Sequence, residues 1–437
     1  MELYLGVGRS VITPKVGAAL YGYAPDHFST SVNDDLTATV FYFEQDGERA
    51  LLASLTLGSL SNGLADEIMS EIEKRHGIPK GSQIIHAIHT HSAPNTTGTY
   101  GWGDVDRKYV DGILLPRLYE AVDTAVKSAV PAEMAVATGE SKVGINRREL
   151  TIENEVRLGQ NPWGPYDPAM TVISFRKTDG TPYANIIHYG AHATAAGKNP
   201  EISRDWPGVM IDVLEAETGA MTAFINGPEG DVGPRLSNGR TTGGGKIEYA
   251  MRHGAVAGQD AVRIRESLGG YSVPKLKTHG GVLDLPLAKR IPLETARQEH
   301  KKYVGETVNN RAQLEKYYRE VIESYENGFV DEKTREVSQN LIRLGDVCIV
   351  AFSYELFSEI GLRIKRESDI PYLLCLSNTN GSEGYFATES EMCRGGYEIK
   401  MTKTAKVQSF TDNADWYVVT ETLKNLDNVK EQTLCIE

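Results

Sequence analysis

Short apolar runs with the two-residue period of β-strands alternate along this chain with longer runs of helical period. The clearest case is TATVFYFEQDGERALLASLTL at 37–57, which predicts two strands joined by a turn at Asp46-Gly47. The following run, 64–77, has apolar residues at helical spacing and ends on Gly77, a typical C-cap residue. Such alternation favours an α/β fold, in which helices and a mixed β-sheet form layers.

The rest of the chain continues this alternation. A buried strand is expected at 82–91 and a helix at 106–128. The stretch 293–327 is strongly charged and helix-prone, which predicts a helical insertion over about 293–330 within a single domain of residues 1–437. Further strands are expected at 133–143, 170–176, 183–189, 221–227, 341–352 and 372–378.

Charge and composition narrow the classes of partner. The 437 residues carry a formal net charge of −13, which disfavours nucleic acid and anionic membrane surfaces as partners. No apolar run approaches the roughly 18 residues of a membrane span, and the N-terminus lacks a basic segment followed by an apolar one. The four cysteines form neither a CxxC pair nor a disulfide framework. We therefore expect a cytoplasmic protein that acts on a small molecule, without stable membrane insertion.

Three of the ten histidines lie within six positions, in HAIHTHSAP at 86–94. In a strand, residues two apart share a face, so His89 and His91 are expected to point one way and His86 the other. Two imidazoles at a strand end can form one edge of a metal site. A hydrogen-bonded pair of structural histidines is the alternative.

Two later segments supply matching ligands. His192 follows a hydrophobic strand and suits a third nitrogen ligand, with His188 as an alternative ligand or a supporting group. Glu355 follows another apolar strand and precedes a helix-like run, where it is either a helix-terminal contact or a ligand. Two histidines, one glutamate and an open position are a recurrent catalytic zinc arrangement. All of these residues stand where strands end, the usual place for ligand-binding groups in α/β proteins.

Other segments add polar groups. The Gly-rich loop INGPEGDVGPR at 225–235 carries Glu229 and Asp231, which are either general bases or solvated turn residues. Arg147 can orient a polar substrate group, and Tyr385 and Tyr397 can donate hydroxyl hydrogens; surface exposure or packing is the alternative. Two glycine-rich stretches, GVGRSV at 6–11 and GRTTGGGK at 239–246, lack the spacing of nucleotide-binding loops.

Seven segments in register make the chain resemble the catalytic domain of the neutral/alkaline (non-lysosomal) ceramidases. The resemblance implies one catalytic domain over residues 1–437, in a form without the C-terminal β-sandwich domain of that family. The matching segments are VGRSVITPKVG (7–17), HTHSAP (89–94), GINRR (144–148), YGAHAT (189–194), NGPEGDVGPR (226–235), YELFSEIGLRIK (354–365) and GYFATESE with GGYE (384–398).

The resemblance also implies a ligand set and a reaction. In that family two histidines, a glutamate and a tyrosine hold one catalytic zinc, here by position His89, His192, Glu355 and Tyr385. The same motifs imply that three further residues line the pocket beside the zinc: His91, Arg147 and Tyr397. The expected reaction is hydrolysis of a carboxylic amide, or an ester, by water whose pKa zinc lowers from about 15.7 to about 7.

One departure separates this chain from that family. The ceramidase loop has a serine to which a catalytic part is assigned, whereas this chain has Gly233, and its nearest hydroxyl is Ser237. The general acid/base is then expected to be His91, with Asp231 or Glu229 as alternatives. A soluble N-acyl or ester compound is the expected substrate. The competing hypothesis is a non-catalytic descendant that binds a metal or a ligand.

Overall fold

Two β-sheets pack face to face in the computed structural model, which describes residues 2–235 and 245–430. Leu5 and Phe41 of the larger sheet share one hydrophobic cluster with Ile342 and Ile349 of the smaller sheet. These side chains alternate along their strands with others that face the helices, as the strand period requires. The α/β fold with a layered mixed sheet is confirmed, and a second sheet adds a layer.

The larger sheet has eight strands in the order β13-β11-β10-β6-β1-β3-β4-β5. The pairs β4/β5 and β11/β13 are parallel and the others are antiparallel. The strands are β1 (Leu3–Val11), β3 (Thr37–Gln45), β4 (Glu48–Leu55), β5 (Gln83–Ala87), β6 (Val130–Glu140), β10 (Ala169–Lys177), β11 (Pro182–Tyr189) and β13 (Met221–Asn226).

The smaller sheet has the order β15-β16-β17-β19, and only its pair β17/β19 is parallel. The expectation of one strand over 341–352 is wrong, because Gly345, with φ of +57°, turns the chain between two antiparallel strands. The apolar run on both sides of this turn conceals it in the sequence. The strands are β15 (Leu276–Pro286), β16 (Thr334–Leu344), β17 (Val347–Ala351) and β19 (Tyr372–Leu376).

Four two-stranded ladders lie outside these sheets, and two of them form around the site described below. Strand β18 pairs in parallel with β20, and β14 pairs antiparallel with β7. The ladder strands are β2 (Ser31–Val32), β12 (Glu201–Ile202), β7 (Gly144–Asn146), β14 (Val232–Pro234), β8 (Arg148–Leu150), β9 (Val156–Leu158), β18 (Glu355–Leu356) and β20 (Tyr385–Phe386).

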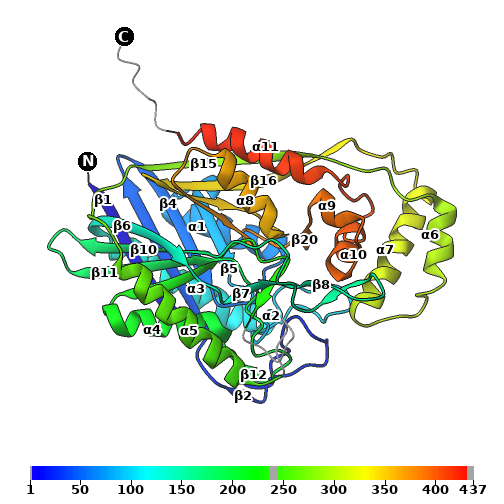
Figure 1. The fold of residues 1–437 in the computed structure, drawn as a ribbon, viewed down its shortest axis with the longest axis horizontal. Coiled ribbons are helices and arrows are strands. Elements are labelled where there is room, and N and C mark those ends of the chain that lie inside the picture. The colour runs from blue at the N-terminus through cyan, green and yellow to red at the C-terminus, as the bar shows by residue number, and fades with distance from the viewer. Residues whose placement is uncertain (1, 236–244, 431–437) are drawn as a thin grey trace, which may run out of the picture.

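Helices cover both outer faces of the sheet pair (Figure 1). Helices α1 and α3 pack on one half of the larger sheet, α4 and α5 on its other half, and α8 and α11 on the smaller sheet. Their bounds are α1 (Asn62–His76), α3 (Leu115–Lys127), α4 (Asp205–Thr218), α5 (Ile247–Glu266), α8 (Ser358–Glu367) and α11 (Ala414–Asp427).

The short helical elements complete the chain. The expected helix at 106–128 is a continuous helical run in which α2, a π-helical turn η2 and α3 follow one another. No helix in the described ranges is both long enough and apolar enough to cross a membrane. The remaining bounds are η1 (Lys80–Ser82), α2 (Arg107–Tyr109), η2 (Val110–Leu114), α9 (Glu389–Met392) and α10 (Tyr397–Lys403).

Helices α6 (Leu293–His300) and α7 (Asn309–Glu326) stand apart from the layers, at the right of Figure 1. They pack on each other through a small cluster that contains Ala296, Tyr317 and Val321. The charged stretch at 293–327 is therefore helical, and its apolar residues are enough for a hairpin of two helices but not for a layer of the main core.

Local signals predict several elements well. The turn at Asp46-Gly47 joins β3 to β4, and both residues have positive φ, as a tight hairpin with the right-handed twist of strands requires. Helix α1 begins after Ser61, whose hydroxyl accepts the Leu64 amide, and ends at Gly77 with φ of +64°.

The expected strand at 82–91 is too long. Strand β5 ends at Ala87, and His89 has a left-handed φ of +68°. His89 and His91 therefore do not share a strand face, and the backbone turn after β5 is what orients them. A left-handed residue other than glycine is uncommon and marks a locally constrained segment. His86, which is inside β5, is buried and hydrogen-bonds the Asn226 amide and the Ser377 carbonyl.

Some sequence features lie outside the described residues. These are Ser237, most of the glycine-rich stretch at 239–246, and Cys435. Of the other three cysteines, Cys348 and Cys375 are buried and Cys393 is exposed.

Candidate active site

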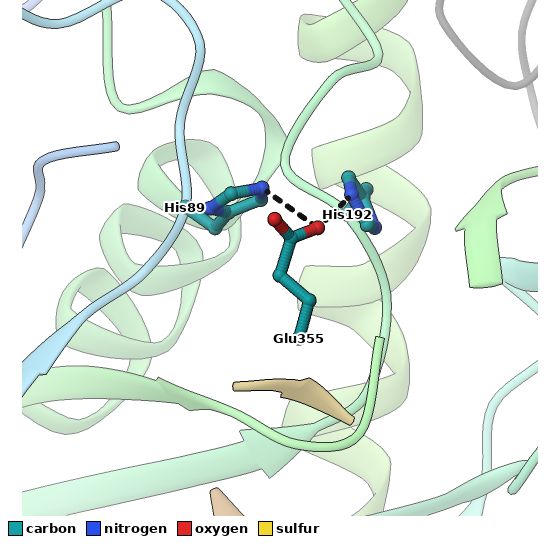
Figure 2. A group of neighbouring side chains, drawn as sticks. All are labelled: His89, His192 and Glu355. Carbon is teal, nitrogen blue, oxygen red and sulfur yellow. Dashed lines mark ion pairs between the residues drawn. The ribbon is translucent and has the colours of Figure 1, made fainter. Parts of the chain in front are cut away.

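Three buried side chains from distant parts of the sequence converge on one point (Figure 2). The Nε2 atoms of His89 and His192 lie 3.4 and 3.1 Å from Oε2 of Glu355. One ligand-type atom from each residue lies within 4.8 Å of the other two. The structure thus brings together the two histidines and the glutamate that the sequence marks at separate strand ends.

Backbone hydrogen bonds position each of the three residues. The His89 amide donates to Leu57 after β4, and the His192 amide donates to Val232 of β14. Glu355 lies in β18, where its amide donates to the Gly384 carbonyl at 2.8 Å. The site therefore forms where the ends of β4, β5 and β11 meet the β18/β20 ladder.

The histidine tautomers follow from their partners. His89 Nδ1 lies 2.9 Å from the Gly58 carbonyl, and His192 Nδ1 lies 2.8 Å from the Glu229 carbonyl. Because a carbonyl oxygen only accepts, each Nδ1 must carry the proton. In the neutral rings both Nε2 atoms then carry lone pairs that face the Glu355 carboxylate. This Nδ1–H···O=C arrangement is the usual support of a metal-binding histidine.

Two lone pairs and a carboxylate repel one another unless a cation lies between them. His192 Nε2 and Glu355 Oε2 are both buried, and neither has a hydrogen-bond partner among the described residues. One proton on His89 would satisfy only one of the two nitrogens. The set of two imidazole nitrogens and a carboxylate oxygen fits a divalent metal such as zinc.

The pKa shifts show the same electrostatic conflict. Burial lowers the pKa of His192 to about 3. Burial also lowers the pKa of His89, but the Glu355 carboxylate outweighs it and leaves that pKa above its ordinary value. For Glu355 burial raises the pKa, yet the two histidines hold it well below the usual range. The carboxylate is therefore ionised and in need of positive charge.

Tyr385 and Arg147 lie next to these three residues. Tyr385 pairs with Glu355 across the β18/β20 ladder, and its hydroxyl accepts a hydrogen bond from Arg147 Nη2 at 3.0 Å. The Arg147 Nε also donates to Glu398 at 3.0 Å. Burial lowers the Arg147 pKa, but the tyrosine and the glutamate raise it above its ordinary value, so the guanidinium stays charged. Arg147 is thus a buried cation whose orientation is set from two sides.

His91 lies within an aromatic cage. Its Nε2 is 3.3 Å from His89 Nε2, and its ring meets Tyr21 and Tyr23 edge-on at 5.2 and 5.1 Å. Its Nδ1 is buried without a hydrogen-bond partner among the described residues. A Cβ atom at Gly22, which has φ of +94°, would lie only 2.2 Å from that nitrogen. Glycine is therefore required at position 22 for His91 to occupy this place.

Tyr21 is a site residue that the sequence patterns do not reveal. Its ring lies edge-on to His89 and His91 and packs against Gly58, the residue whose carbonyl fixes the His89 tautomer. The only local signal is a tyrosine-glycine-tyrosine triplet, which indicates a turn without indicating its contacts.

A cavity of about 430 Å³ opens onto this group. Its inner end is lined by His89, Glu355 and Tyr385, together with His91 and Tyr397. The Tyr397 ring, at the start of α10, lies edge-on to Tyr385 at 5.7 Å. The size of the cavity suits a small ligand.

The two acidic residues of the loop at 226–235 lie behind the cavity rather than in its wall. Asp231 accepts hydrogen bonds from Asn146 and from the amide and hydroxyl of Ser358, which ties β7 to the start of α8. Glu229 is fully buried and accepts from Asn378 at 2.6 Å. Burial raises the pKa of Asp231 to about 7 and that of Glu229 to about 8.

Two other predicted residues also lie outside the cavity wall. Gly233 is buried in β14 and pairs with Ile145 of β7. His188, considered above as an alternative ligand, points Nε2 to the Cys375 carbonyl at 3.0 Å and is not part of the group of three.

Comparisons with known proteins find solved structures with a similar fold. A crystal structure of neutral ceramidase from Pseudomonas aeruginosa has a TM-score of 0.74 at 17% identity, over 98% of this chain and 74% of that chain. A structure described as ceramidase complexed with C2 has a TM-score of 0.72 at 16% identity, over 96% of this chain and 74% of that chain. A search of curated protein sequences finds no match.

At these identities the two solved structures establish the fold, and the family follows from the sequence itself. Residues 3–251, more than half of the chain, match the family described as neutral/alkaline non-lysosomal ceramidase, N-terminal. That family consists of metal-dependent hydrolases of amide bonds, and this chain carries a buried His-His-Glu group. The chain belongs to the neutral/alkaline non-lysosomal ceramidase family.

Proposed function

We propose that this protein is a zinc-dependent hydrolase that cleaves the carboxylic amide bond of a small, soluble N-acyl compound. The single observation that carries the proposal is the pair of Nδ1-fixed imidazoles whose Nε2 atoms face the Glu355 carboxylate. We propose His89, His192, Glu355 and Tyr385 as the four ligands of one zinc ion. The same site would also accept an ester, whose carbonyl has the same shape.

Zinc, when bound, would polarise the scissile carbonyl and make water acidic enough to act near neutral pH. Arg147 would hold the Tyr385 hydroxyl in place, and its fixed positive charge would stabilise negative charge on the carbonyl oxygen. Tyr397, at the inner end of the cavity, would donate its hydroxyl hydrogen to the same oxygen.

The proton transfers require a group that reaches the cavity. We propose His91 as general acid/base, because it lines the cavity beside His89 and its Nδ1 has no described partner. For Asp231, a candidate general base on sequence grounds, we propose instead a positioning role. Its carboxylate oxygens are engaged by Asn146 and Ser358, and its carbonyl accepts the Arg147 amide.

We also propose that residues 1–437 act as one catalytic domain in the cytoplasm. The sheets and all the ligand-bearing segments form one continuous structure, from His89 near β5 to Tyr385 in β20. The scattered cysteines fit a reducing compartment, and the net charge of −13 disfavours binding to an anionic membrane surface.

A second candidate is a binding protein that kept the metal site without turnover. Gly233 favours it, because the residue that replaces the family's serine has no side chain with which to take part in chemistry. Retention of the ligand set, of Arg147 and of an accessible His91 favours the enzyme.

The test is zinc content per chain, measured by inductively coupled plasma mass spectrometry, together with release of free amine from a panel of N-acyl amides. The parent is compared with His89→Ala and Glu355→Ala. His76→Ala serves as control, since His76 bonds Asp123 at the surface, away from the site.

We expect about one zinc in the parent and in the control, none in the two ligand variants, and hydrolysis only where zinc is bound. Stoichiometric zinc without turnover of any amide or ester would favour the binding protein. A parent that takes up no zinc would refute the ligand assignment.

A further inference from the structure

One face of α7 forms the outer wall of the cavity. Gln313, Lys316, Tyr317 and Glu320 line it, and their spacing of three, four and seven residues places them on one side of a helix. Arg319 and Glu323 of the same helix, which pair with each other at 3.5 Å, do not line the cavity. The helix thus presents a defined set of side chains to whatever enters the cavity.

The hairpin is held against the cavity at both ends. At the start of α7, the Asn309 amide donates to Gly101 at 2.6 Å, in the loop that also lines the cavity. At its other end, Arg290 binds Asp331 at 2.5 Å and donates to the Ser324 hydroxyl and the Phe329 carbonyl. These contacts make α7 a fixed wall of the cavity.

The charges of this wall are already paired. Lys316 and Glu320 form an ion pair at 2.6 Å one turn apart. Elsewhere in the cavity lining, Lys406 pairs with Glu383, which also accepts a hydrogen bond from Asn62. A charged substrate would find no unpaired counter-charge among these four residues. An uncharged one with hydroxyl groups could replace the water around them.

An alkyl chain is a poor fit for the same wall. A chain that lies between the two ion pairs would remove water from polar groups without replacing their hydrogen bonds, which is costly. Size acts in the same direction. The cavity of about 430 Å³ lies in the lower part of the range of roughly 300–1,000 Å³ found for small-molecule pockets, which suits one sugar-sized ring with a short acyl group.

Flat rings complete the wall. Tyr100, Trp102 and Tyr317 also line the cavity. Aromatic faces pack well on the C–H faces of a saturated ring, while the ring's hydroxyls reach polar neighbours. Ion-paired acids and bases together with aromatic faces suit a ligand that is polar, uncharged and ring-shaped.

The geometry points to the α7 face as the wall that selects the amine half of the substrate: a short N-acyl derivative of an uncharged, polyhydroxylated amine about the size of one amino sugar. This inference rests on the proposed function, since it assigns the substrate of the same site. Scission of the amide adds water across the C–N bond, so a short carboxylic acid and the free amino sugar leave.

The test compares three amides that differ in one respect each. N-acetylglucosamine and N-acetylcyclohexylamine share the acyl group and a six-membered ring, but only the first has hydroxyls. N-hexanoylsphingosine adds alkyl chains. We expect kcat/KM for N-acetylglucosamine to exceed that for N-acetylcyclohexylamine by about tenfold or more, the effect of one or more satisfied polar contacts. N-hexanoylsphingosine should be the poorest of the three.

A matched pair of double variants tests the wall itself. Lys316→Met with Glu320→Leu removes the ion pair that lines the cavity, and Arg319→Met with Glu323→Leu removes a pair on the same helix that does not line it. We expect only the first to lower the kcat/KM ratio of N-acetylglucosamine to N-acetylcyclohexylamine, towards one. Zinc content should remain at the parent level in both double variants. Lys406→Met, elsewhere in the cavity lining, should lower the same ratio independently of α7 packing.

The outcomes separate the two proposals. If the zinc-loaded parent hydrolyses no amide, the proposed function fails. If kcat/KM for N-acetylcyclohexylamine or N-hexanoylsphingosine equals or exceeds that for N-acetylglucosamine, the proposed function stands and this inference is wrong. The inference is also wrong if both double variants change the kcat/KM ratio of N-acetylglucosamine to N-acetylcyclohexylamine equally. The same holds if Lys406→Met leaves that ratio unchanged.

Discussion

The two ends of the cavity are built on different principles. At the inner end His89, His192 and Glu355 are buried, and backbone carbonyls fix both imidazoles. At the outer end Lys316 and Lys406 keep 40% and 42% of their side chains exposed, in ion pairs that are accessible to solvent. Rigid, dehydrated groups hold charge in one place, as a reaction requires, whereas hydrated groups can exchange water for a ligand.

This difference sets the size of mutational effects. Removal of one member of a buried, hydrogen-bonded charge group leaves its partners unpaired in a low-dielectric setting. Removal of one member of an exposed ion pair typically changes stability by less than about 1 kcal/mol. Four variants test the contrast from the inner end outwards.

The largest effect is expected for His192→Ala. The loss of a ligand removes the Lewis acid, which supplies several kcal/mol, so hydrolysis should fall about a thousand-fold at roughly tenfold per 1.36 kcal/mol. In the parent, zinc at a hundred times its Kd should stabilise the fold by about 2.7 kcal/mol. Thermal unfolding with and without zinc measures this shift, which should vanish in the variant. A variant that keeps the shift would place the metal elsewhere.

The next effect compares two neighbouring arginines. Arg147 and Arg148 are both buried and both bind Glu398, but only Arg147 reaches Tyr385. Each change to Met should cost about 3 kcal/mol of stability by breaking a buried ion pair. Only Arg147→Met should also lower kcat, by about a hundred-fold. Denaturant unfolding and steady-state kinetics separate the two effects, and equal kcat losses in both variants would assign Arg147 a purely structural role.

Gly22→Ala tests how tightly His91 is placed. The new Cβ would collide with His91 Nδ1, so kcat should fall by about a hundred-fold, the usual cost of a 1 Å misplacement. Zinc content should not change, because His89 is held from the Gly58 side. Gly17→Ala is the control, since Gly17 has a similar φ of +96° but nothing within 4 Å of its added Cβ. Similar losses in both variants would point to backbone strain instead.

The smallest effect is expected for Lys406→Met. Its ion pair with Glu383 is partly exposed, so unfolding in urea should show a change of less than about 1 kcal/mol. Zinc content should stay at the parent level, and KM should change by a few-fold while kcat changes little. A large loss of kcat would mean that the outer end takes part in the chemistry.

Several features of the fold are local and could be predicted. The β3/β4 hairpin and helix α1 depend on neighbouring residues, namely Asp46-Gly47 at the turn and Ser61 and Gly77 at the caps. The prediction of one strand over 341–352 is wrong, because no strong turn signal marks Gly345. The apolar run there is divided into two antiparallel strands. The second sheet was not predicted, because a strand pattern does not indicate which sheet a strand joins.

The candidate site depends on both levels. Sequence patterns marked His89, His192 and Glu355 as residues at strand ends, and the family resemblance gave the pattern a chemical meaning. The strand periodicity invoked for His89 and His91 was the wrong reason, since a left-handed turn after β5 orients both rings. The type and order of the residues therefore predicted which residues belong to the candidate site. The strand pattern did not predict the direction in which the His89 and His91 side chains point.

The sequence by itself determined which residue types are available for chemistry, the helices and turns set by neighbouring residues, and the net charge. The tertiary structure decided which of these residues meet. Packing of segments that are far apart in the sequence places Tyr21 against His89, Asp231 behind the cavity, and one face of α7 along it. Local periodicity carries no information on such distant contacts, because they depend on how whole layers pack and not on the residues beside each one.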